Sequence, residues 1–307
     1  MDIAVIGSNM VDLVSYIDQM PKEGETLEAL SFSIGCGGKG ANQAVAAAKL
    51  GAKVMMLTKV GEDLFADNTI RNLNEYGVDT EFVSKVPGTC SGVAPIFVDK
   101  QSQNRILIIP GANKHLLPVD IDAAAEKLKK CSLFVLQMEI PLPTIYYAIE
   151  FGNKHGIPVI LNPAPASREL DLNYVQKCEF FVPNETELEI ITGMPVETEQ
   201  QIEAAAMSLI QKGIKNVIVT MGKRGALWLT EEQVHHVEAY KVNAIDTTGA
   251  GDAFIGCFAH VYVKNRDVLM SIKMASAFAA LSVTGRGTQT SYPDVATYEQ
   301  FLQRHGK

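Results

Sequence analysis

The stretch SIGCGGKGANQAVAAAKLG, from Ser33 to Gly51, places a run of glycines and one lysine directly before an alanine-rich helical segment. Glycine turns that open helices commonly hold an anion, because the first N–H groups of a helix have no partner within it. The spacing Gly35-x-Gly37-x-x-Gly40 also matches the fingerprint of a dinucleotide-binding turn. The glycine pattern therefore leaves two interpretations of the stretch: a site for a nucleotide phosphate, or a site for a different ligand.

The residues around these glycines weaken the phosphate interpretation. The dinucleotide fingerprint requires a buried parallel strand just before it, whereas LEALSFSIG alternates with Ser31 and Ser33 and is typical of an edge strand. Lys39 is followed by Gly40 rather than Ser or Thr, so the stretch is not a P-loop. A nicotinamide-dependent oxidoreductase is therefore the less favoured alternative.

Outward from this stretch, short apolar runs alternate with helical segments along the chain. The apolar runs are Ile3–Gly7, Val54–Gly61, Leu133–Gln137, Ile157–Pro163, Glu179–Asn184 and Val217–Gly222. The helical segments are Asn42–Leu50, Asp120–Lys130, Leu142–Lys154 and Ile202–Lys212. Nearly continuous apolar strands that alternate with helices predict an α/β fold, with a mostly parallel central sheet covered by helices on both faces.

Two regions interrupt this alternation, at about residues 13–34 and 89–109. Both carry strand and turn signals without a helix, and SGVAPIFVDKQSQNRILIIPG predicts two antiparallel strands around the polar turn DKQSQN. We expect one domain, residues 1–307, with a small β-sheet formed by these two regions. Such a sheet would be half exposed, and suited to act as a lid or to pair with another subunit.

Composition excludes several classes of function. The chain has 307 residues, of which 47% are hydrophobic and 20% charged, as in ordinary globular proteins. Acidic residues outnumber basic ones by 35 to 27, and no Lys/Arg cluster is present, so nucleic acid is not an expected partner. No apolar run approaches the roughly 20 residues of a membrane span. Five scattered cysteines without a C-x-x-C pair predict reduced thiols and a cytoplasmic protein.

A second glycine loop, DTTGAGDAFIGCF, leads straight into a helical pattern. The N–H groups of Gly249, Ala250 and Gly251 would form an anion hole at the helix N-terminus, and Asp252 follows in the first turn. A carboxylate beside an anion hole can take a proton from a hydroxyl while the hole stabilises a transferring phosphoryl group. Alternatively, Asp252 only complements the helix dipole and the glycines only turn the chain.

Two further groups of oxygen atoms are candidate cation ligands. Asp246 and Thr248, with carbonyls of the later turn SVTGRGTQTS, could enclose a cation. Asn184 and Glu187 are three residues apart on the first turn of an expected helix, so they share one face that suits Mg²⁺. The alternative for this pair is a solvated acidic helix start. The glycine turn in TMGKRGALW is equally compatible with a plain hairpin.

Taken in order, GGKGANQAVAAAKLG, NPAPA, PNETE, TMGKRG and DTTGAGDAF resemble the ribokinase family of ATP-dependent sugar and nucleoside kinases. The resemblance runs from about Ile3 to Pro293. It implies a pentose substrate, ATP with Mg²⁺, K⁺ as a monovalent activator, and a homodimer formed through the β lid. It also implies that the opening glycine stretch grips the sugar and that the nucleotide lies elsewhere.

The resemblance assigns roles to individual residues. Asp252 would be the base for the 5-hydroxyl, and Gly249, Ala250 and Gly251 would hold the γ-phosphoryl group. The sugar would contact Met10, Asp12, Gly38, Lys39, Asn42 and Glu139. Asn184 and Glu187 would govern Mg²⁺ and phosphate, while Thr220, Gly222 and Gly225 would flank the nucleotide, with Ser276 where a histidine often lies near the adenine. The K⁺ loop would comprise Asp246, Thr248, Ser282, Gly285, Gly287 and Ser291.

One departure from the family pattern bears on the substrate. The family usually reads G-S-x-N-x-D after the first strand, and here Met10 stands at the asparagine position. A sugar hydroxyl placed against this thioether would lose its water without gaining a good partner, which costs about 1–3 kcal/mol of binding free energy. A CH₂ group at the same point would instead contribute roughly 0.8 kcal/mol in favour of binding. We therefore expect 2-deoxy-D-ribose as the substrate, with D-ribose as the alternative. A catalytically silent sugar-binding protein is a further alternative, although it would be expected to lack Asp252 or its glycines.

Overall fold

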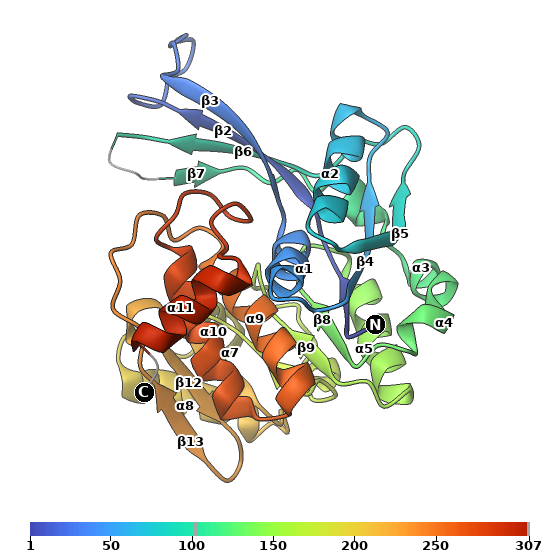
Figure 1. Ribbon diagram of the computed structural model, residues 1–307, viewed down its shortest axis with the longest axis vertical. Coiled ribbons are helices and arrows are strands. Elements are labelled where there is room, and N and C mark those ends of the chain that lie inside the picture. Colours follow the sequence, from blue (N-terminus) through green and yellow to red (C-terminus); the bar gives the residue numbers. More distant parts are fainter. Residues whose placement is uncertain (101–103, 306–307) are drawn as a thin grey trace.

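The computed structural model of this protein describes residues 1–100 and 104–305, and these residues form two β-sheets with helices (Figure 1). The large sheet has nine strands in the order β13-β12-β11-β10-β9-β8-β1-β4-β5. Their bounds are β1 Ile3–Ile6, β4 Val54–Val60, β5 Asp79–Lys85, β8 Leu133–Leu136, β9 Val159–Leu161, β10 Phe180–Phe181, β11 Val217–Thr220, β12 Ala226–Leu229 and β13 Val234–Val237. All neighbours from β11 to β5 are parallel, and β12 and β13 extend the sheet antiparallel.

Helices cover both faces of this sheet and bury one apolar cluster on each. One face carries α1 Lys39–Lys49, α2 Leu64–Glu75, α9 Ala250–Asn265, α10 Val268–Ser282 and α11 Val295–His305. The other carries α3 Pro118–Ala123, α4 Ala125–Leu128, α5 Leu142–Lys154, α6 Leu172–Val175, α7 Glu185–Thr192 and α8 Glu199–Ile210. Two 3₁₀ turns, η1 Gly111–His115 and η2 Gly222–Arg224, complete the elements. The predicted α/β architecture is confirmed.

The small sheet, called here the lid sheet, contains the segments that the sequence predicted. Its order is β3-β2-β6-β7, with bounds β2 Met10–Tyr16, β3 Ser31–Gly37, β6 Val93–Val98 and β7 Asn104–Ile106. Strands β6 and β7 pair antiparallel as predicted, while residues 101–103 of their turn lie outside the described residues. The sheet projects from one end of the body (Figure 1). Its edge strands expose apolar side chains, among them Phe32, Ile34 and Ile106, and Leu30 just before β3 is exposed as well.

Three local predictions need correction or extension. The predicted helix over 120–130 is two short helices, α3 and α4, because Ala124 leaves the helical conformation between them (φ −93°, ψ 0°). The lid strand β2 begins at Met10, three residues before the predicted boundary, so Met10 and Asp12 lie on a strand. TMGKRGALW forms a hairpin, in which β11 and β12 pair antiparallel around η2.

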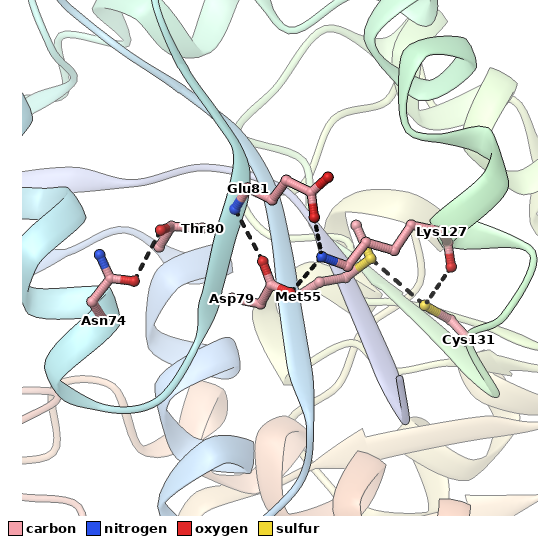
Figure 2. A network of polar contacts seen from close by, with 7 residues as sticks. All are labelled: Met55, Asn74, Asp79, Thr80, Glu81, Lys127 and Cys131. Atoms are coloured by element: carbon pink, nitrogen blue, oxygen red, sulfur yellow. Dashed lines mark hydrogen bonds and ion pairs between the residues drawn. The ribbon is translucent and has the colours of Figure 1, made fainter.

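The outer parallel strand β5 pairs with β4 and is also held by a lysine of α4. Lys127 of α4 contacts both Asp79 Oδ2 and Glu81 Oε2 of β5, and Cys131 lies against Met55 of β4 beneath it (Figure 2). On the other side, Thr80 donates to Asn74 at the end of α2. This edge lies away from the candidate site described below. Within the described residues, no helix is long and apolar enough to cross a membrane.

Helix α1 packs on helix α9 at a glycine. A Cβ atom at Gly256 would lie 2.5 Å from Ala46 Cβ and 2.6 Å from the main-chain oxygen of Gln43. Since both neighbours belong to a buried helix, a side chain at 256 would push the two helices apart. The close approach brings the first turn of α1 against the first turn of α9.

We expect Gly256→Ala to lower the free energy of unfolding by about 1–3 kcal/mol, because the added methyl group overpacks this contact. Denaturant unfolding followed by circular dichroism measures the change. Gly35→Ala is the matched control, since its nearest neighbour would be 3.9 Å away and the stability should hardly change. Equal stability of Gly256→Ala and the wild-type protein would contradict the packing argument.

Candidate active site

Asp252 lies in the first turn of α9, where the chain enters the helix through glycines. Gly249 is the N-cap in the left-handed conformation (φ 74°), and the side chain of Asp252 is buried. Its two oxygens each accept one hydrogen bond from α1, Oδ2 from Asn42 Nδ2 at 3.0 Å and Oδ1 from Gln43 Nε2 at 2.9 Å. The carboxylate is therefore fixed by the neighbouring helix.

The backbone amides beside Asp252 are unused. Among the described residues, the N–H groups of Gly251 and Asp252 have no hydrogen-bond partner, and that of Ala250 makes one long contact of 3.3 Å with the oxygen of Thr247. No side chain caps α9. Unpaired N–H groups at a helix N-terminus attract an anion. Of the predicted anion-hole groups, the Gly251 N–H is thus free and the Ala250 N–H is weakly engaged, and the Asp252 N–H, which was not predicted, is free beside them.

The N-terminus of α1, in contrast, is filled by the protein itself. The N–H of Lys39 donates to Glu139 Oε2 (3.0 Å), that of Gly40 to Ser8 Oγ (3.3 Å), and that of Ala41 to the main-chain oxygen of Ser8 (2.9 Å). A Cβ at Gly40 would lie 2.6 Å from that same oxygen, so only glycine allows this contact. The first-turn amides of α1, from Lys39 to Ala41, are therefore paired with protein oxygens and are not free for a phosphate.

The dinucleotide alternative also fails on topology. Gly35 and Gly37 lie on β3, which is an edge strand of the lid sheet and pairs antiparallel with β2. A dinucleotide fingerprint needs the end of a central parallel strand. The nicotinamide-dependent oxidoreductase is therefore contradicted.

Several predicted sugar-binding residues gather around Asp252. The Asp12 carboxylate on β2 lies over Gly37, where a Cβ would be 2.4 Å from Asp12 Oδ2. Burial, together with the charges of Glu139 and Asp252, raises the pKa of Asp12 to about 7. Burial alone would lower the pKa of Lys39, yet the carboxylates of Asp252, Glu139 and Glu187 raise it. The Lys39 ammonium group thus interacts with three carboxylates, while Asp12 interacts with two of them, Glu139 and Asp252.

Glu139 and Met10 complete this region. Glu139 Oε2 accepts from Ser8 Oγ (2.5 Å) as well as from Lys39 N, which holds its carboxylate at the start of α1. Met10 lies on the same face of β2 as Asp12, two residues away, and only 3% of it is exposed. Its sulfur contacts Asn113 Nδ2 at 3.7 Å and fills the space beside Gly92.

A pocket of about 790 Å³ opens beside the anion hole. Its lining includes Ala250 and Gly251 together with four residues that the sequence assigned to the nucleotide, namely Thr220, Gly222, Gly225 and Ser276. The Ser276 hydroxyl is buried without a hydrogen-bond partner. The sequence did not identify the segment after β13 as part of this wall, where Glu238, Tyr240, Lys241, Val242 and Ala244 line the pocket. That segment carries no recognisable motif.

Asn184 and Glu187 begin helix α7, as the alternative of an acidic helix start predicted, and they also face the site. They form a capping box on α7, in which the N–H of Glu187 donates to Asn184 Oδ1 and the N–H of Asn184 donates to Glu187 Oε2, both at 2.8 Å. A β-bridge sets Asn184 beside Thr220. Burial raises the pKa of Glu187, and Asp252 adds to this, against the lowering effect of Asn184 N–H and Lys39.

The structure brings the two parts of the expected K⁺ loop together. Asp246 Oδ1 accepts from the N–H and hydroxyl of Thr248, and Oδ2 accepts from the N–H of Gly287 at 3.0 Å. Burial would raise the pKa of Asp246, but these hydrogen bonds lower it overall. Gly285 N–H donates to the main-chain oxygen of Ser282, and a Cβ at Gly285 would lie 3.1 Å from Ser291 Cβ, so these three residues are also close together. Within the described part of the chain, no cluster of three His, Cys, Asp or Glu residues could hold a metal.

Comparison with known proteins gives a consistent result. A model of the pfkB family of carbohydrate kinases matches residues 1–295. A deoxyribokinase from Salmonella typhi is 68% identical over 302 residues, which are 98% of this chain and 99% of that protein. A ribokinase from Mus musculus is 38% identical over 295 residues, which are 95% of this chain and 91% of that protein.

Solved structures agree. The ribokinase of Arabidopsis thaliana, determined with ribose and ATP, superposes with a TM-score of 0.93 at 31% identity and covers 98% of each chain. The ribokinase of Thermotoga maritima superposes with a TM-score of 0.90 at 36% identity over 98% of this chain and 99% of that chain. Because the family model spans nearly the whole chain and these relatives exceed 30% identity, the protein belongs to the pfkB family of carbohydrate kinases.

Proposed function

We propose that this protein transfers the γ-phosphoryl group of ATP to the 5-hydroxyl of 2-deoxy-D-ribose, giving 2-deoxy-D-ribose 5-phosphate and ADP. The observation that carries the proposal is the fixed carboxylate of Asp252 beside the unpartnered N–H groups of Gly251 and Asp252, at the wall of the large pocket. The 68% identity to a deoxyribokinase supports this substrate over D-ribose.

The geometry supports an in-line transfer with few protein groups. Asp252 takes the proton of the sugar hydroxyl, whose oxygen forms a bond to the γ-phosphorus while the bond to the β-phosphate oxygen breaks and ADP leaves. The free amides at the start of α9 stabilise the charge that spreads over the transferring group. Since they are held by the backbone, they need no rearrangement to act.

The remaining assignments follow the same arrangement. Asp12, Lys39 and Glu139 bind the sugar hydroxyls, with the backbone at Gly38 and the side chain of Asn42 beside them. The nucleotide occupies the 790 Å³ pocket, in contact with Thr220, Gly222, Gly225 and Ser276. The free main-chain amides and the size of this pocket fit a nucleoside triphosphate.

Two cations are assigned by the chemistry of their donors. Mg²⁺ would be held near Asn184 and Glu187, and the Glu187 carboxylate interacts electrostatically with Lys39 and Asp252. The Mg²⁺ ion would neutralise charge on the phosphates. K⁺ would be held by Asp246, Thr248 and main-chain oxygens of Ser282, Gly285, Gly287 and Ser291. One carboxylate among carbonyl oxygens suits a weakly charged, large cation.

The lid sheet serves as the sugar lid and as the contact of a homodimer. Its strands β2 and β3 join the body at Gly7–Asn9 and Gly38, next to Asp12 and Lys39. Exposed Leu30, Phe32 and Ile34 give its edge an apolar surface that a second copy would cover.

An assay of ADP release over a panel of ribose, 2-deoxyribose, fructose, adenosine and inosine tests the substrate. We expect the highest kcat/KM with 2-deoxyribose and a lower value with ribose. Turnover with a nucleoside alone would refute the pentose assignment, and a higher kcat/KM for ribose would select the ribokinase alternative.

Asp252→Asn should lower kcat by about 10²–10⁴-fold, because the amide cannot accept the hydroxyl proton. Sugar binding, measured by calorimetry without ATP, should largely persist. Asp267→Asn is the matched control, since Asp267 only caps α10 and an asparagine caps equally well. Retention of normal kcat by Asp252→Asn would exclude this residue as the base.

Met10→Asn should shift the ratio of kcat/KM values toward ribose by about tenfold, because an amide can pair with a hydroxyl that the thioether leaves unpaired. Met10→Leu is the control, and it should preserve the preference for 2-deoxyribose. The two sugars are compared in the same ADP-release assay. An unchanged ratio in Met10→Asn would remove Met10 from the specificity argument.

A further inference from the structure

A chain of buried side-chain amides leads to the carboxylate of Asp252. Gln43 Nε2 donates both to Asp252 Oδ1 (2.9 Å) and to Asn162 Oδ1 (3.2 Å), and Gln43 Oε1 accepts from Gln137 Nε2 (2.7 Å). Gln137 follows β8 and Asn162 follows β9, so both lie at the carboxyl ends of parallel strands. Gln43 is 1% exposed, Gln137 0% and Asn162 7%. These amides therefore bond to one another and not to water.

One backbone carbonyl sets the direction of the whole chain. The main-chain oxygen of Val182 can only accept, so Asn162 must present its Nδ2 there, at 2.9 Å. Asn162 Oδ1 then faces Gln43, so Gln43 must donate to it from Nε2. Both Nε2 hydrogens of Gln43 are therefore donated, one to Asn162 and one to Asp252. A flipped Gln43 would set its oxygen against two acceptors and lose both bonds.

The second oxygen of Asp252 is held by a separate chain. Asn42 Nδ2 donates to Asp252 Oδ2 (3.0 Å), Asn42 Oδ1 accepts from Gln289 Nε2 (3.0 Å), and Gln289 Oε1 accepts from Asn72 Nδ2 (2.7 Å). Each carboxylate oxygen thus receives one donor, and the two donors are consecutive residues of α1. Two fixed donors determine the plane of the carboxylate and leave a lone pair on each oxygen unused.

We propose that Gln43 is a positioning residue for phosphoryl transfer, whose amide, oriented through Asn162 by the carbonyl of Val182, holds the Asp252 carboxylate in the plane that aims its free lone pairs at the sugar hydroxyl. The inference rests on the proposed role of Asp252 as the base. Gln43 is too deeply buried to meet the substrate, so it acts only through Asp252.

Gln43→Met tests the proposal, because methionine has a similar length and no donor. We expect kcat to fall by on the order of 10–100-fold, as for a misplaced reacting group. The KM values for ATP and 2-deoxyribose should change little, since the contacts made in the ground state remain. If Gln43 only filled the core, its replacement would change stability but would not lower kcat while leaving KM unchanged.

The pH profile supplies a second readout. Because the Gln43 donor stabilises the charged form of the carboxylate, its loss should move the acidic limb of the kcat/KM profile to higher pH. Asp12, Lys39, Glu139 and Glu187 also face this region, but they are the same in both proteins, so the difference between the profiles belongs to position 43.

Gln43→Glu sharpens the readout. Its carboxylate would face acceptors on both Asp252 and Asn162, whereas its protonated form could still donate to one of them. Activity of Gln43→Glu should therefore fall more steeply above neutral pH than below it, relative to Gln43→Met. The same pH dependence in both variants would contradict the proposed direction of the hydrogen bond.

Two further variants keep the test decisive. Thr69→Val is the matched control, because it removes another buried polar atom, without a partner and outside both chains, and kcat should stay normal. If Gln43→Met does not fold, Asn162→Leu removes the group that orients Gln43 and should lower kcat to a smaller extent. Where both fold, the double variant should lose no more than Gln43→Met, since the two act in series.

The outcomes separate this inference from the proposed function. A normal kcat in folded Gln43→Met, a rise in KM alone, or an equal loss in Thr69→Val would overturn the positioning role. If these occur while Asp252→Asn is inactive, only the inference fails. If Asp252→Asn itself is fully active, the base assignment fails first.

Discussion

The close contact between α1 and α9 is the constraint on which the candidate site depends. Gly256 allows the backbone of α9 to approach Gln43 and Ala46 of α1. At one end of this contact, Asn42 and Gln43 reach the carboxylate of Asp252. At the other end of α1, Lys49 donates to the main-chain oxygens of Gln289 and Tyr292, and the hydroxyl of Tyr292 donates to the oxygen of Gly249. A single helix therefore organises both the base and the loop that carries the anion hole.

The two helix N-termini of the site have the same electrostatic character and opposite uses. The first turn of α1 is neutralised by Glu139 and Ser8, which turns its positive end into a holder for a carboxylate. The first turn of α9 keeps its amides free beside the pocket. Because the first-turn amides of α1 are paired and those of α9 are free, the phosphate is proposed to bind at α9 and the sugar away from it. Glycine content alone does not distinguish the two turns, since both are rich in glycine and both open a helix.

Sequence reasoning could therefore predict the elements and the motif residues, but not every contact between them. The apolar runs predicted the parallel strands, and GAGD predicted free amides beside a carboxylate, because both are local patterns. The bond from Gln43 to Asp252 joins residues 209 positions apart and leaves no periodic signal. The break at Ala124 likewise depends on packing that a helical pattern does not record. The assignment of Lys39 and Asp12 to the sugar came from family resemblance. The sequence does not show which charged groups surround these two residues, whereas the structure does.

The proposed sugar site contains several carboxyl groups, and their charges influence one another. Asp12, Glu139, Glu187 and Asp252 can each accept a hydrogen bond or hold a cation, and among the described residues Lys39 is the cation that interacts with Glu139, Glu187 and Asp252. Burial and repulsion from Glu139 and Asp252 raise the pKa of Asp12 to about 7, so this carboxyl group can take up a proton near neutral pH. Asp252 instead receives two neutral donors, which stabilise its charge without adding a cation that would compete for the phosphate. Amides rather than lysines behind Asp252 thus leave the positive potential at the start of α9, where the triphosphate is proposed to bind.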